Sequence, residues 1–195
     1  MSRPSGGLSF RKKKRLDGTK LQEVTKYVFG IVAAIMLALF LTYNFGMKTS
    51  VIGNSMEPTL DNGQTVFFSR LSYLFRQPKE GDIIVFLPNG NKYTHYYVKR
   101  VVATPGDTVL ISNGDILVNG EMLEGDFDKI LDAGIAENEI TLAEDEFFVV
   151  GDNINSGEDS RSGNIGPVNK SLIEGRVWFK IKSGDNMTGF VKRSL

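Results

Sequence analysis

The chain has 195 residues, of which 41% are apolar, and its formal net charge is zero. This composition is too apolar for a chain that is disordered throughout, and the length suffices for one domain with its own core plus an appendage. The chain contains no cysteine, which excludes disulfides, thiolate catalysis and cysteine-built zinc sites.

The first 26 residues form a basic tail. Eight lysines and arginines stand against two acidic residues up to Lys26, so the tail carries about +6 and the remainder about −6. The run RKKKR, residues 11–15, lies beside an apolar stretch, which favours anionic lipid over nucleic acid as its partner. We therefore expect residues 1–26 to be a partly disordered cytoplasmic tail.

Residues 27–47, YVFGIVAAIMLALFLTYNFGM, contain no charge and are long enough to cross the roughly 30 Å of a bilayer core as a helix. A cleaved signal peptide would have a shorter apolar run and a small-residue cut site, and a buried core helix would carry a polar face. The pattern predicts one uncleaved transmembrane anchor. The positive-inside rule puts the N-terminus in the cytoplasm and residues 48–195 outside the cell membrane.

The residues after Met47 have the composition of β-strands. Turns are marked by Gly-Asp pairs that begin at Gly81, Gly106 and Gly151, and Asn113-Gly114 predicts a two-residue hairpin. The polar, acidic stretch 121–146 is predicted to be a loop or a small insertion. The expected strands lie within QTVFFSR (64–70), DIIVFLP (82–88), KYTHYYVKRVVA (92–103), TVLISNGDILVNG (108–120), EFFVVGD (146–152) and GRVWFKI (175–181).

The turn GNSMEPTL holds Ser55, which is a weak nucleophile until a base removes its proton. The one histidine of the chain, His95, and Lys99 would share a face of a regular strand about 13 Å apart, so without a bend both cannot touch one serine. Lysine can act as the base if its pKa falls by about three units, which burial among apolar neighbours can cause. Met56, beside the serine, either enters the membrane interface or packs against the site.

Five motifs follow one another behind the anchor: GNSMEPTL, GDIIVF, VKRVVATPGD, VVGDN and EDSR. In this order they resemble the type I signal peptidases of bacteria over nearly all of residues 27–180. The short stretch between Gly120 and Glu146 resembles the compact Gram-positive form. The resemblance implies a mainly β protein, with a coiled antiparallel catalytic sheet behind one transmembrane helix.

The resemblance also implies a function and a site. Residues 48–195 would be an extracytoplasmic peptidase that uses Ser55 as nucleophile and Lys99 as general base, without metal or cofactor. Its partners would be secreted preproteins, cut after an Ala-X-Ala-like sequence, and the phospholipid membrane, with no nucleic acid. By position, the substrate pockets would be lined by Ile52, Tyr97 and Val98. Structural roles near the site are expected for Arg100, Asp152, Asn153, Asp159 and Arg161.

Two positions depart from patterns found in the family. Gly53 stands where some members carry a serine that helps to bind the oxyanion, so a backbone group or water would serve instead. Gly157 stands where members often carry a serine that orients the lysine, and Ser156, Ser160 or packing would replace it. These departures leave an alternative: a degenerate homologue that serves as a membrane-tethered partner in pilus assembly. A self-cleaving repressor of the SOS response would need an N-terminal DNA-binding motif in place of the anchor.

Overall fold

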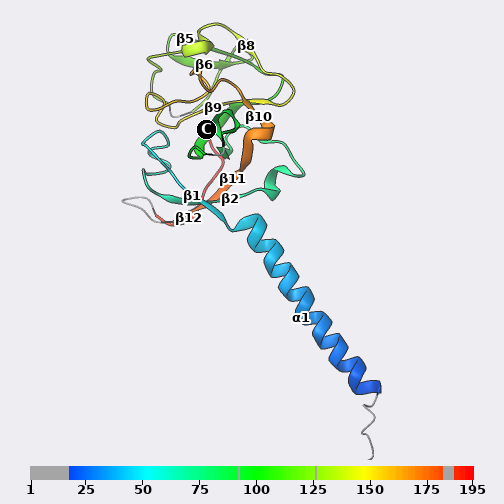
Figure 1. Cartoon of the computed structure of the whole chain (residues 1–195). Helices are drawn as coiled ribbons and strands as arrows, with labels where there is room; N and C mark the ends of the chain where they lie inside the picture. The colour runs from blue at the N-terminus through cyan, green and yellow to red at the C-terminus, as the bar shows by residue number, and fades with distance from the viewer. Residues whose placement is uncertain (1–17, 92, 126, 182–186) are drawn as a thin grey trace, which may run out of the picture. The chain divides into compact units, whose positions relative to one another are not determined.

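The structure, a computed structural model, describes residues 18–91, 93–125, 127–181 and 187–195. The predicted basic tail lies outside the described residues as far as residue 17. Helix α1 spans Gly18–Phe45 and thus begins before the predicted start at Tyr27 (Figure 1). It ends before Met47, which instead opens the first strand. The segment Thr19–Phe45 is long and apolar enough to cross a membrane, since its 27 residues extend about 40 Å.

The chain divides into two compact units with the boundary between Phe40 and Leu41. The second unit is mainly β, and each of its strand pairs among the described residues is antiparallel. This confirms the predicted fold class. The strands are β1 Met47–Ser50, β2 Thr65–Ser69, β3 Ile83–Phe86, β4 Tyr97–Ala103, β5 Thr108–Ser112, β6 Asp115–Val118, β7 Glu121–Met122, β8 Ile140–Thr141, β9 Glu146–Val150, β10 Val168–Asn169, β11 Ile173–Lys180 and β12 Gly189–Phe190.

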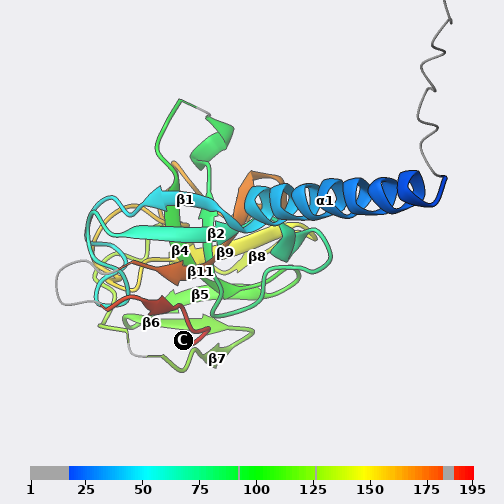
Figure 2. The same cartoon turned by 90° about the horizontal axis from the view of Figure 1, so that it is seen from below.

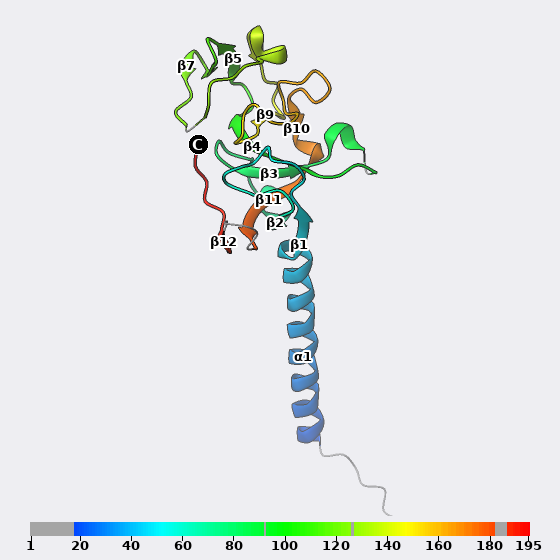
Figure 3. The ribbon, with the colours of Figure 1, turned by 90° about the vertical axis from the view of Figure 1, so that its left-hand side faces the viewer.

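The larger sheet is curled and has the strand order β1-β2-β11-β3-β4-β9-β10, with β12 paired to β11. Figure 3 lets the reader follow this order from β9 down to β1. The strand β11 comes late in the chain yet lies between β2 and β3. The two parts of the sheet are therefore joined by pairing between segments that are distant in sequence. Strand β4 lies inside the sheet, between β3 and β9, and is buried along almost its whole length.

The smaller sheet has the order β7-β6-β5-β8 and forms a separate layer from β1, β2 and β11 (Figure 2). Its centre is the predicted hairpin, in which Asn113 (φ 55°) and Gly114 (φ 82°) form the turn between β5 and β6. Both central residues have positive φ, the requirement of the turn type that matches strand twist. The predicted loop at 121–146 contains short elements: β7, β8 and a 3₁₀ turn at Gly134–Glu137.

Three apolar clusters hold these layers together, and burial of each large side chain stabilises the fold by about 1.5–3 kcal/mol. One lies between the small sheet and β9, one under the turn that contains Ser55, and one beneath β3, β4 and β9. Representative members are Ile111, Leu142 and Phe148 for the first, Met56, Leu60 and Phe68 for the second, and Phe86, Val101 and Phe147 for the third.

One predicted strand differs from the structure. The expected strand over 92–103 starts only at Tyr97, because the chain turns at Pro88–Gly90 and again at Thr94, whose N–H and hydroxyl both bond the Asn91 carbonyl. His95 therefore does not alternate with Lys99 on one strand, and the expected spacing of about 13 Å does not apply.

Candidate active site

The turn that carries Ser55 is fixed at several points. Met56 and Leu60 are fully buried, and the Leu60 N–H bonds the Met56 carbonyl at 2.8 Å. The Ser55 carbonyl accepts a hydrogen bond of 3.1 Å from the N–H of Asn153, just after β9. Met56 thus packs in the core, and the alternative that it enters the membrane interface is wrong.

The backbone of Ser55 also approaches Gly151 very closely. A Cβ at Gly151 would lie 2.3 Å from the Ser55 carbonyl oxygen, a distance that no side chain could tolerate. The Gly-Asp pair at this position marked only a turn in the sequence. In the structure, the backbone of Gly151 packs directly against the backbone of Ser55.

Lys99 lies in the middle of β4, opposite Ile84 of β3, and only 3% of it is exposed. Alternation along the strand places its side chain on the same face as Tyr97 and Val101. Lys99 therefore belongs to an inner strand of the sheet, with β3 on one side and β9 on the other, and its amine is buried.

Ser55, Lys99 and the three predicted substrate-binding residues line one cavity of about 360 Å3. The remaining lining residues are Val51, His95, Tyr96, Gly157 and Glu158. Ile52 is exposed, Tyr97 is half-buried and Val98 is buried. The structure thus brings together, on one cavity, residues from the serine turn, from β4 and from the loop after β9.

Ser55 and Lys99 both lie beside Gly157. A Cβ at this glycine would lie 3.9 Å from Ser55 Oγ and 3.7 Å from Lys99 Nζ. Among the described residues no hydrogen bond joins these two atoms, and neither Ser156 nor Ser160 bonds the amine; the Ser160 hydroxyl accepts from the Val149 N–H instead. Catalytic hydrogen bonds are often long before substrate binds and tighten in the complex.

The pKa of Lys99 is lowered from 10.5 to about 8. The largest cause is burial, which removes water from the ammonium form. Asp159 opposes this effect, Arg161 supports it, and Asp152 and Glu158 oppose it more weakly. A lysine with this pKa is neutral in a useful fraction of molecules near neutral pH.

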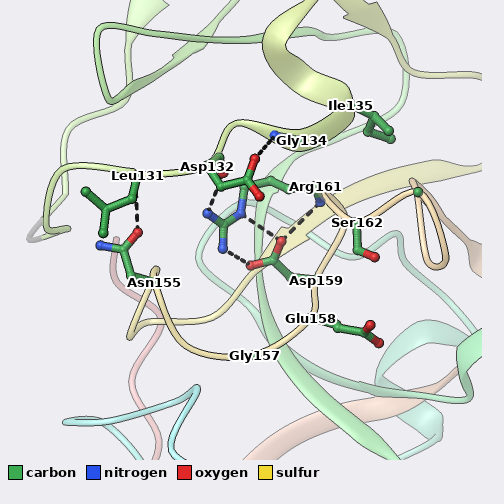
Figure 4. A pocket seen from close by; sticks show the side chains of 11 residues that line it. Leu131, Asp132, Gly134, Ile135, Asn155, Gly157, Glu158, Asp159, Arg161 and Ser162 are labelled. Carbon is green, nitrogen blue, oxygen red and sulfur yellow. Dashed lines mark hydrogen bonds and ion pairs between the residues drawn. The ribbon is translucent and has the colours of Figure 1, made fainter.

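Asp159 and Arg161 form a buried ion pair, which lines a second cavity (Figure 4). The Arg161 Nε and Nη2 groups donate to the carboxylate at 2.9 and 2.8 Å, and further donors reach the carbonyls of Asp132 and Ile154. The pair holds a carboxylate near Lys99 with its charge offset by a cation. The structure contains the ion pair that the sequence suggested, while its role in shaping the loop near the site stays a prediction.

Arg100 and Asp152 form a second buried pair, with two hydrogen bonds of 2.6 Å. Arg100 also donates to the carbonyls of Gly81 and Ser194. Because Asp152 precedes Asn153, this pair anchors the segment that binds the Ser55 carbonyl. Gly53, where some relatives have serine, donates its N–H to the Asn62 side chain at 3.0 Å.

The described residues contain no group of three or more His, Asp or Glu side chains placed to hold a metal ion. The cavity contains an alcohol and an amine of lowered pKa, a nucleophile and a base of the kinds that a serine hydrolase can use. Sequence comparison narrows this class. The family described as signal peptidase, peptidase S26, matches residues 24–182, and the chain belongs to it.

Two relatives of known name agree with this family. Signal peptidase I P from Bacillus subtilis subsp. natto is 31% identical over 176 residues, which cover 85% of this chain and 91% of the relative. Probable signal peptidase I-2 from Synechocystis sp. is 30% identical over 153 residues, covering 76% of this chain and 70% of the relative. A crystal structure of a signal peptidase I from Enterococcus faecalis V583 is 26% identical, with a TM-score of 0.40, and covers 52% of this chain and 97% of that one.

The chain is therefore a type I signal peptidase, a serine peptidase that removes signal peptides in association with a membrane. The apolar helix Thr19–Phe45 is consistent with membrane anchoring. The family match favours the peptidase and gives no support to the pilus-assembly alternative.

Proposed function

We propose that Ser55 is the nucleophile and Lys99 the general base of this peptidase. The observation that supports this most directly is the pKa of Lys99, which burial lowers to about 8. At pH 7 roughly a tenth of the amine is then neutral and able to accept a proton, compared with a few parts in ten thousand for a solvated lysine. The Ser55 hydroxyl is the nearby alcohol in the same cavity.

The reaction follows from these two groups. Neutral Lys99 accepts the Ser55 proton as the oxygen attacks the scissile carbonyl carbon, and the carbonyl oxygen becomes an oxyanion. The C–N bond then breaks, and Lys99 gives the proton to the leaving amine. Water attacks the remaining Ser55 ester, and Lys99 takes one proton from that water and returns it to the Ser55 oxygen. The signal peptide leaves as a carboxylic acid, which releases the other proton to solvent and becomes a carboxylate.

The oxyanion needs a donor, and the backbone N–H of Ser55 is the candidate. Among the described groups this N–H donates to no acceptor, and it belongs to a turn held firmly by Asn153. Preorganised donors of this kind stabilise a transition state by about 3–4 kcal/mol each. A side-chain hydroxyl at residue 53 is absent, so the second donor would be backbone or water.

Substrate would bind as an extended strand between the segment 50–54 and the start of β4, through backbone hydrogen bonds. The side chains at −1 and −3 would then point toward Ile52, Tyr97 and Val98, which line the cavity. Alanine-sized groups would fit and larger ones would meet the wall, so an Ala-X-Ala-like site is selected by exclusion.

The proposal extends to topology. The basic residues 1–26 would lie in the cytoplasm, the helix would cross the cell membrane once, and the β unit would face outward. A cysteine introduced into an exposed β-unit position, Glu144, should react with a membrane-impermeant maleimide added to intact cells. Labelling only after the cells are broken would place the β unit on the cytoplasmic side.

The test of the mechanism uses the purified full chain in detergent with a preprotein that carries an Ala-X-Ala site. Ser55→Ala and Lys99→Met should each lower kcat/KM at least about 10³-fold. The matched controls Ser112→Ala and Lys79→Met, at positions outside the cavity, should cut normally. Cleavage by Ser55→Ala or Lys99→Met at the rate of the parent enzyme would exclude the mechanism.

A further inference from the structure

A second cavity, of about 530 Å3, adjoins the one that contains Ser55 and Lys99. It is formed by segments 131–135 and 155–163, and Gly157 and Glu158 line both cavities. The two hollows therefore share a wall next to the reacting groups. Nothing in the mechanism above uses the second one.

Next to Ser55 the two cavities are separated at Gly157, which has no side chain that could block the passage between them. A Cβ there would lie 3.2 Å from the Ser55 Cβ, and the glycine has a φ of +82°, which disfavours other residues. A chain bound over Ser55 can therefore pass this point without meeting a side chain.

The charged side chains that line the second cavity carry a net negative charge. Arg161 is nearly buried, and its guanidinium is occupied by the Asp159 carboxylate and by two carbonyls. The other charged groups on the lining are the carboxylates of Asp132 and Glu158, both exposed. Figure 4 shows Glu158 turned away from the Asp159–Arg161 pair, and among the described residues it has no ion-pair partner.

Resting on the proposed function, we propose that this second cavity receives the preprotein segment that follows the cleaved bond. The residues before the bond occupy the first cavity, so the segment after it must leave across Ser55, and the second cavity adjoins that point. Glu158 stands where the two cavities join. It should favour a cationic side chain just after the cleavage site and disfavour an anionic one.

The experiment uses the full chain in detergent and preproteins that are identical up to residue −1. Positions +1, +2 and +3 carry in turn Lys, Gln or Glu, and kcat/KM is measured for each. The parent enzyme should prefer Lys over Glu at one or more positions by about two- to fivefold, the strength of an exposed ion pair. The preference should shrink at high salt.

Variants of Glu158 separate this role from a structural one. Glu158→Gln should bring the Lys/Glu ratio toward one, Glu158→Asp should keep its sign and Glu158→Lys should reverse it. The matched control Glu144→Gln, an exposed carboxylate on a different cavity, should leave the ratio as in the parent enzyme. Selection of alanine at −1 and −3 should stay the same in all of them.

The outcomes distinguish the two proposals. If the parent enzyme cuts without a charge preference, or if Glu158→Gln keeps the preference, the second cavity does not select the downstream segment, while the Ser55–Lys99 mechanism still stands. If Ser55→Ala or Lys99→Met cuts at the parent rate, the mechanism fails, and the assignment of the second cavity fails with it.

Discussion

The guanidinium of Arg161 lies 2.8 Å from the carboxylate of Asp159, in a buried pair beside the amine of Lys99. Asp159 raises the pKa of Lys99 and Arg161 lowers it. The pair thus places a carboxylate close to a general base while cancelling much of the effect that would keep the base charged.

Replacing Arg161 with Gln should therefore raise the pKa of Lys99. The acid limb of the pH–kcat/KM profile should move to higher pH, and the rate at pH 7 should fall severalfold. The fold should lose about 3–5 kcal/mol, since a buried carboxylate loses its partner. The double variant Asp159→Asn/Arg161→Gln should bring the limb back toward pH 8; a limb that stays displaced would contradict this electrostatic account.

The pH dependence of the parent enzyme follows from the same group. Because the base must be neutral, kcat/KM should rise with pH through a pKa of about 8 and level off above it. His95 lines the cavity but is exposed, and it is not the base that we propose. In His95→Gln the limb should remain near pH 8; its disappearance would identify the histidine as the base.

Lys99 should also destabilise the fold at neutral pH. Its folded pKa of about 8 lies below its ordinary value of 10.5, so between these values the unfolded chain binds more protons and stability rises with pH. Below pH 8 the full cost of about 3 kcal/mol is present. Lys99→Met should therefore be more stable at pH 7 by up to this amount, though inactive.

The measurement is urea unfolding of the full chain in detergent, followed by the fluorescence of Trp178, the one tryptophan in the sequence. The stability difference between the variant and the parent should decline as the pH rises from 8 toward 10.5. A difference that is independent of pH would mean that packing, and not charge, is responsible.

Gly151→Ala should disturb the nucleophile. The new methyl group would lie 2.3 Å from the Ser55 carbonyl oxygen, so the turn must move, and a displacement of about 1 Å costs about 10²-fold in rate. Gly189→Ala is the matched control, since a Cβ there meets nothing within 4 Å. Equal activity of the two variants, measured on the same preprotein, would show that the serine turn adapts to the methyl group.

The sequence predicts the strands well where the pattern is local. The hairpin at Asn113-Gly114 is confirmed because its turn chemistry lies within two residues. The strand at 92–103 is predicted too long, since the turn at Thr94 depends on bonds to Asn91 that alternation does not reveal. The place of β11 between β2 and β3 depends on pairing between residues that are 87 to 114 positions apart in the chain, for which no local signal exists.

In the candidate site, too, some features could be predicted from local sequence patterns and others could not. Ser55, Lys99 and the three residues expected on the substrate pocket do line one cavity, as the motifs suggested, while their roles remain predictions. Glu158, at the junction of the two cavities, was absent from the expected site. The close approach of Gly151 to Ser55 was also missed, because a contact between a turn and the end of a distant strand leaves no pattern in either segment.

Both Ser55 and Lys99 are tied to β9. The Ser55 carbonyl accepts a hydrogen bond from the Asn153 N–H, just after β9. Lys99 belongs to β4, which pairs directly with β9. The small sheet is inserted between β4 and β9 in the chain, and longer surface connections add little closure entropy. A longer insertion in this interval would therefore add structure to the protein while β4 and β9 stay paired.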